Sequence, residues 1–164
     1  MGASERGGRY WVEKGGLSAI EIGDEAIVDV EDFTLEGRPM SNVRQTVNKA
    51  KREGFTSDVI KVSDMSVDER IELKALAATW RGDSKERGFS MSMDRFIGEM
   101  DIDALLIRGY KEGRLIAFLY FVPWGKVGYS LDRMQRAPEP FPGITELMIL
   151  EAIEYCRENK WKYL

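Results

Sequence analysis

Apolar residues recur along the chain at two spacings, one typical of strands and one typical of helices. Alternation over residues 19–30 favours one or two strands, and residues 55–62 form a second alternating run. Three later apolar runs, 104–110, 114–124 and 127–132, are separated only by the short turns Lys-Glu-Gly and Gly-Lys. Because glycine-containing turns this short are typical of hairpins, these runs predict an antiparallel meander.

Helical spacing predicts two helices between these strands. The first begins at Ser41, which we expect to cap it, and ends at Gly54, a common C-terminal stop. In the second, Ser66 and Glu69 have the spacing of a capping box, which predicts a well-defined start. The positions expected to face the core are Val67, Ile71, Leu76 and Trp80.

Two more helices and a strand complete the predicted elements. A short helix over 92–100 follows a polar loop. A helix over 145–159, with Thr145 as its cap, is apolar around most of its circumference, so we expect Cys156 to be a buried structural thiol. Residues 160–164 resemble the first half of a further strand, which suggests a domain truncated in its final strand.

The predicted order of elements is β, α, β, α, α, β, β, β, α, β. Such an order favours an α/β fold in which helices flank a mixed, mostly antiparallel central sheet. This arrangement is similar to the GNAT fold of acyl-CoA N-acyltransferases. With 164 residues and 43% hydrophobic composition, residues 1–164 are expected to form a single GNAT-like domain.

Composition narrows the possible chemistry. Histidine is absent and one cysteine is present, so a Cys/His zinc site, an internal disulfide and a histidine-containing triad are excluded, and no metal is expected. A general base must be a carboxylate, a tyrosine, a lysine or the substrate. The net charge of −4 argues against polyanion binding over the whole surface. No apolar run approaches the roughly 18 residues of a membrane span, so we expect this chain to be soluble.

The most basic stretch is 38–52, which contains no acidic residue. On a helix, its basic and amide side chains would form a face beside the apolar stripe. Two interpretations stay open, namely a solvated helix surface and a local phosphate-binding face. The candidate binding residues are Arg38, Arg44, Asn48, Lys49 and Lys51.

A carboxylate and two guanidinium groups stand where the last meander strand ends. We expect Asp132 and Arg136 to project from the end of the sheet, where α/β folds often bind ligands. The alternative is a surface ion pair of little energetic weight. Glu146 is a weaker carboxylate candidate at the start of the following helix, where the helix dipole favours an ionised side chain.

Several separate motifs together resemble one enzyme family. They are residues 2–55, RGFSMSMDRF, GRLIAFLYFVPWG, YSLDRMQR and ITELMILEAIEYCRENKWKYL. In this combination and order the chain resembles the catalytic domain of the aminoacyl-phosphatidylglycerol synthases. The likeness is to its second GNAT-like half and is greatest for lysylphosphatidylglycerol synthases fused to a lysyl-tRNA synthetase.

The resemblance implies a transferase that moves lysine from lysyl-tRNA to phosphatidylglycerol without a cofactor. It also implies an upstream GNAT-like half, a membrane domain and possibly a fused lysyl-tRNA synthetase as partners, and a full-length protein at the cytoplasmic face of the cell membrane. A homodimer would cover a face left exposed in this fragment, and the fragment is not expected to be active alone.

Matching the motifs assigns the family's acidic position to Asp132 and its basic helix motif to Arg44, Asn48 and Lys49. The family usually has arginine three residues after the aspartate, but this chain has Gln135 there and Arg136 next to it. The expectation is that Asp132 orients or deprotonates the glycerol hydroxyl, or holds the lysyl ammonium, while Arg136 compensates phosphate or oxyanion charge.

Two other functions remain open on the sequence. One is a GNAT-fold acyltransferase that uses acyl-CoA. It is disfavoured because loop 136–147 contains three prolines, which lack the N–H groups of a phosphate cradle, and Glu139, which would repel the anion. The other is a non-catalytic module that binds a lipid surface or a partner domain.

Overall fold

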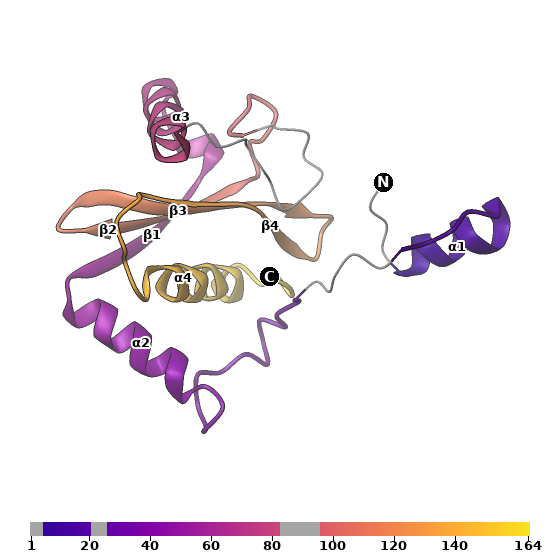
Figure 1. The fold of residues 1–164 in the computed structure, drawn as a ribbon, viewed down its shortest axis with the longest axis horizontal. Coiled ribbons are helices and arrows are strands. Elements are labelled where there is room, and N and C mark those ends of the chain that lie inside the picture. Colours follow the sequence, from indigo (N-terminus) through magenta and orange to yellow (C-terminus); the bar gives the residue numbers. More distant parts are fainter. Residues whose placement is uncertain (1–4, 21–25, 83–95) are drawn as a thin grey trace.

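The computed structural model describes residues 5–20, 26–82 and 96–164 of the chain. Figure 1 shows a central sheet with α3 above one face and α4 below the other, while α2 lies beneath α4 and α1 stands apart from the body. No helix among these residues is long and apolar enough to cross a membrane. The elements are α1 (Glu5–Gly15), α2 (Ser41–Arg52), β1 (Phe55–Lys61), η1 (Val62–Asp64), α3 (Val67–Arg81), β2 (Leu105–Lys111), β3 (Arg114–Trp124), β4 (Gly128–Arg136) and α4 (Ile144–Glu158).

The sheet confirms the predicted meander. Its four strands run antiparallel in the order β1-β2-β3-β4. The segments expected at the two ends of the chain contribute single bridges, because Tyr163 pairs with Asp29 in the antiparallel sense and with Gly128 in the parallel sense. The described part of the predicted strand at 19–30 therefore holds a bridge and no strand, and residues 21–25 lie outside the described residues.

Two apolar clusters fill the faces of the sheet. The larger lies between the sheet, α2 and α4, and includes the fully buried Cys156, as predicted. The smaller lies under α3 and is built on Phe118 and Tyr120 of β3. Here the ring centroids of Phe118 and Trp80 lie 6.0 Å apart, and those of Phe118 and Phe96 lie 5.2 Å apart, so stacked aromatic rings join α3 to the sheet.

Of the three helix caps predicted from the sequence, the structure confirms one and contradicts two. The capping box of Ser66 and Glu69 is present in both directions. Ser41 is the first residue of α2 and not its cap, since the cap is Met40 and makes no side-chain hydrogen bond. Thr145 is likewise inside α4, because Gly143 caps the helix with a left-handed φ of 86° that glycine adopts without strain.

The buried face of α3 also differs from the predicted stripe. Val67 and Ile71 are 71% and 60% exposed, whereas Leu73 and Ala77 are buried. The helix is therefore rotated relative to the stripe, since the short Ala77 side chain allows close approach to the sheet. In the predicted helix 92–100, residues 92–95 lie outside the described residues and residues 96–100 are not helical.

Candidate functional site

Asp132 occupies a β-bulge in the middle of β4. Tyr120 pairs with Arg133 and the next residue of β3, Phe121, pairs with Leu131, so the ladder skips Asp132. A bulge re-aims side chains and is common beside active sites. The Asp132 side chain is fully buried, with 0% exposure, so the expectation that it projects from the sheet end is wrong.

Asp132 lies close to the Tyr120 hydroxyl, which also meets Ile97 and Asp101 of the segment that begins at Phe96. Burial raises the pKa of the Tyr120 hydroxyl, and the carboxylates of Asp101 and Asp132 raise it further. Tyr120 is therefore a neutral phenol at physiological pH. Ile97 lies next to this hydroxyl with a φ of 51°, a strained conformation for a β-branched residue, and strain of this kind is frequent near functional sites.

Arg133 is the buried cation of this cluster, and it was not among the candidates drawn from the sequence. Its side chain is 5% exposed, and its guanidinium carbon lies 4.5 Å from the ring centroid of Phe96. Burial and then the charge of Arg81 lower the pKa of Arg133. Strict alternation would place Asp132 and Arg133 on opposite faces, but the bulge brings both beside Tyr120.

The structure places the side chains of Gln135 and Arg136 differently. The Gln135 side-chain amide donates a hydrogen bond to the carbonyl oxygen of Ala77, which ties β4 to α3. Arg136 is exposed at the end of β4 and lines a pocket of about 430 Å³. The pocket is lined by Trp80, Arg81, Met134, Gln135, Arg136 and Thr145.

This pocket brings two guanidinium groups to the first turn of α4. Arg81 ends α3, Arg136 ends β4, and Thr145 is the second residue of α4. The N-terminus of a helix carries partial positive charge, so Arg81, Arg136 and the first turn of α4 all favour the binding of an anion. Glu146 is half-buried in the same helical turn but is not among the described residues that line the pocket.

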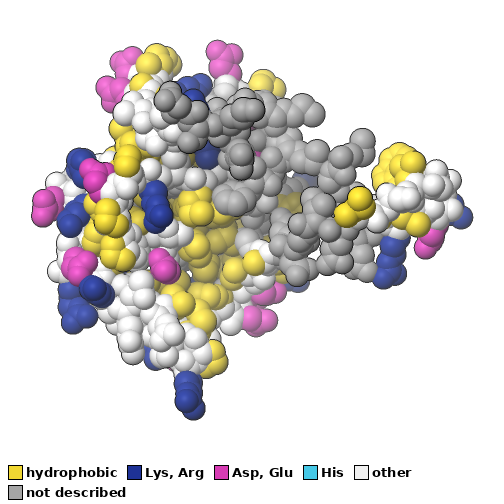
Figure 2. Space-filling model, viewed as in Figure 1, with side chains coloured by type: hydrophobic (Ala, Val, Ile, Leu, Met, Phe, Trp, Pro, Cys, Tyr) yellow, Lys and Arg dark blue, Asp and Glu magenta, His cyan; other side chains and the backbone are white. Residues whose placement is uncertain are grey.

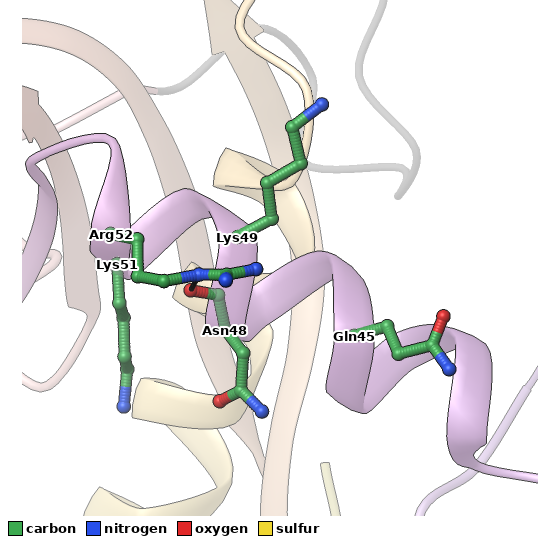
Figure 3. Close-up of a pocket in the computed structure, with 5 residues that line it drawn as sticks. All are labelled: Gln45, Asn48, Lys49, Lys51 and Arg52. Atoms are coloured by element: carbon green, nitrogen blue, oxygen red, sulfur yellow. Dashed lines mark hydrogen bonds between the residues drawn. The ribbon is translucent and has the colours of Figure 1, made fainter.

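The basic face of α2 forms a separate surface. A hollow of about 780 Å³ is lined by Gln45, Asn48, Lys49, Lys51 and Arg52, whose side chains spread outward from one helix (Figure 3). The Lys49 ammonium lies 3.7 Å from the carboxylate of Glu53, so part of its charge is compensated. In the space-filling view, dark-blue and magenta side chains lie next to one another along the edge of the molecule that holds the last turn of α2 (Figure 2).

Two arginines assigned to this surface from the sequence are placed differently. Arg44 is half-buried, and its Nη1 donates hydrogen bonds to the carbonyl oxygens of Leu35 and, at 3.3 Å, Gly37. It therefore holds the loop that precedes α2 and is not among the residues lining the hollow. Arg38 is exposed in that loop. The residues that line this hollow and those that line the pocket at the end of β4 do not overlap.

Comparison with known proteins gives a consistent set of relatives. The sequence model of the family described as phosphatidylglycerol lysyltransferase, C-terminal, matches residues 1–164. The lysylphosphatidylglycerol biosynthesis bifunctional protein LysX of Rhodococcus jostii is 41% identical over 92% of this chain, and that of Mycobacterium avium is 42% identical over 92%. The chain spans only 14% and 13% of the lengths of these two relatives.

Solved structures confirm the predicted α/β fold. The L-PGS structure from Bacillus licheniformis superposes with a TM-score of 0.70 and 26% identity, covering 86% of this chain and 45% of that one. The C-terminal domain of a putative lysylphosphatidylglycerol synthetase from Agrobacterium fabrum gives a TM-score of 0.72 at 22% identity, over 92% of this chain and 48% of that one. At that identity the second likeness concerns the fold alone.

Proposed function

This chain belongs to the family of phosphatidylglycerol lysyltransferase C-terminal domains, and we propose that it serves the transfer of lysine from lysyl-tRNA to phosphatidylglycerol. It would do so as one domain of a longer membrane-associated protein, together with an upstream GNAT-like half. The observation that carries the proposal is β4, which holds the buried acid Asp132 at its bulge and ends in the arginine-lined pocket.

The transfer exchanges one ester for another. The glycerol hydroxyl oxygen attacks the lysyl carbonyl carbon, the ester bond to the terminal ribose of the tRNA breaks, and the hydroxyl proton passes to the departing ribose oxygen. Because aminoacyl-tRNA is already an activated ester, positioning and charge stabilisation supply most of the catalysis. A site without histidine, metal or cofactor is compatible with such a reaction.

The side chains divide into contact and positioning groups in this proposal. Arg136, together with Arg81, lines the pocket and would hold a substrate phosphate or the negative charge that develops on the ester oxygen. Asp132 is closed off from solvent, so we assign it to positioning through Tyr120 and Arg133, its neighbours at the bulge.

The basic face of α2 is proposed as the surface that meets phosphates of the tRNA acceptor end. Lys49 and Lys51 are exposed in its hollow and would neutralise phosphates locally on an otherwise acidic chain. The amide of Asn48 can hydrogen-bond the same backbone. Arg44 contributes indirectly, because it fixes the loop before the helix.

The experiment is lysyl transfer from lysyl-tRNA to phosphatidylglycerol by a full-length protein containing this domain. Arg136→Ala should lower kcat/KM about 10- to 100-fold, the effect of losing a hydrogen bond to a charged group. The matched control is Arg114→Ala, since Arg114 is an exposed arginine on β3 that pairs with Glu139 at 3.4 Å and is not among the described residues that line the pocket. Equal rates for both variants would remove Arg136 from the reaction.

Asp132→Asn separates the positioning role from a merely structural one. Loss of transfer in a variant with unchanged thermal unfolding supports the assignment, whereas near-normal transfer by the folded variant removes Asp132 from the mechanism.

The basic face of α2 is tested by changing Lys49 and Lys51 together to Ala. This change should reduce the slope of the logarithm of the tRNA-binding constant against the logarithm of salt concentration by about two ion contacts. An unchanged slope would make this face a solvated helix surface.

A further inference from the structure

The turn between β3 and β4 presents an exposed apolar surface. Residues 123–127, Pro-Trp-Gly-Lys-Val, are all exposed and contain one cation and no acid. Trp124 is 42% exposed and Val127 43%, whereas Tyr129, two residues further on, is buried. Apolar side chains that project together from a rigid turn mark a contact surface and not a core.

The C-terminal segment 160–164 holds this turn in place. The backbone N–H groups of Lys162 and Tyr163 both donate to the Val127 carbonyl oxygen, at 2.9 and 3.1 Å. Gly128 makes this approach possible, because a Cβ there would lie 2.1 Å from the Tyr163 carbonyl oxygen. The turn and the C-terminus therefore lie at the same end of the sheet (Figure 1).

Aromatic rings and lysines meet on this surface. The ring centroids of Trp124 and Tyr163 are 5.8 Å apart, and the Lys162 ammonium lies 4.9 Å from the Tyr163 centroid. Lys126 and Lys160 are also exposed, and the acids that face Lys162 are Asp29 and Asp32. We call Trp124, Lys126, Val127, Lys162 and Tyr163 the tip platform.

We infer that the tip platform docks onto an anionic lipid surface. Tryptophan and tyrosine rings prefer the boundary between headgroups and acyl chains, and lysines beside them reach the lipid phosphates. Charge complementarity favours this occupant, because the three exposed lysines Lys126, Lys160 and Lys162 outnumber the two acids that face Lys162, on a chain whose net charge is −4. The inference rests on the proposed function, in which the acceptor is phosphatidylglycerol, an anionic lipid of the bilayer.

The platform and the arginine-lined pocket lie at opposite ends of β4. The strand begins at Gly128 in the platform, passes the buried Asp132 and ends at Arg136 beside the pocket. At the rise of an extended strand, the path from Gly128 to Arg136 is about 26 Å, several times the roughly 5–8 Å depth of a headgroup layer. Docking at the tip therefore holds the domain on the bilayer while the pocket stays clear of the headgroups.

The test is co-sedimentation of the 164-residue chain with phosphatidylcholine vesicles that contain or lack phosphatidylglycerol. The chain should partition onto the anionic vesicles and be released by salt. Changing Lys126 and Lys162 together to Gln should lower partitioning about 25-fold, fivefold for each lysine near the surface. Trp124→Ala should lower it on both vesicle types, whereas Trp11→Ala, at a tryptophan that is 49% exposed on α1, should not.

Three results would overturn the inference. They are unchanged partitioning of both platform variants, equal loss with Trp11→Ala, and a dimer in sedimentation analysis that dissociates on Trp124→Ala, since a second copy would then be the occupant. Lysyl transfer to detergent-solubilised lipid, assayed in parallel on the full-length protein, does not require docking. Its failure would therefore count against the proposed function and leave the docking result unaffected.

Discussion

Replacing Cys156 by Ala should make the stability of the chain less sensitive to alkaline pH. Cys156 is fully buried on α4, and burial raises the pKa of its thiol from 9.0 to about 11. Between these values the unfolded chain releases a proton that the folded chain retains, so ionisation favours the unfolded state. The thiol's contribution is fully present below pH 9 and is lost as pH rises through about 11.

The size of the effect follows from the difference between the two pKa values. About two pH units, at about 1.36 kcal/mol each, give a loss of about 3 kcal/mol in the free energy of unfolding. Tyr129 adds a second loss at higher pH, because burial raises its pKa to about 12, and most of this loss remains in the variant because burial is a larger cause of the rise than the charge of Cys156.

The assay is urea denaturation of wild type and Cys156→Ala at about pH 8 and about pH 11. The variant should be less stable than wild type at the lower pH, since the smaller side chain leaves a cavity beside the α4 core, but the gap should narrow at the higher pH. A gap that stays constant between the two pH values would refute the reasoning, because the thiol would then titrate equally in both states.

Two further predictions concern local structure. Ser66→Ala should lower the free energy of unfolding by about 1 kcal/mol, since it removes the side-chain oxygen that caps α3, and Ser66→Thr should restore most of it in the same urea titration. Gly128→Ala should lower the thermal midpoint and weaken vesicle binding together, because the new Cβ would lie 2.1 Å from the Tyr163 carbonyl oxygen; an unchanged midpoint would contradict the close approach seen here.

The elements with strong local signals were predicted well. The meander was recognisable because short glycine turns separate three apolar runs, and α3 because Ser66 and Glu69 satisfy each other's backbone groups. The buried side of α3 was not, since its orientation depends on the close fit of Ala77 and the stacking of Trp80 on Phe118. Contacts between residues far apart in the sequence cannot be read from the spacing of apolar residues within one helix.

At the candidate site, too, local sequence signals could be read and contacts between distant residues could not. The basic face of α2 could be read from helical spacing, and Asn48, Lys49 and Lys51 line one hollow on it. The hydrogen bonds of Arg44 to loop carbonyls could not be foreseen, because they depend on the path of residues 35–37. α1 was missed for another reason: its three glycines weaken helical propensity, although its Tyr10 and Trp11 are exposed on an ordered helix.

The bulge at Asp132 divides β4 into two parts whose side chains alternate out of step with each other. Residues before it and residues after it follow the inward and outward alternation of the sheet, but with opposite parity. Deleting Asp132 would therefore leave an unbroken ladder in which the residues beyond it keep their present partners and faces, so that Gln135 would still reach α3 and Arg136 would still line its pocket. One extra amino acid in this strand thus buries an acid without changing which layer of the molecule its last four side chains serve.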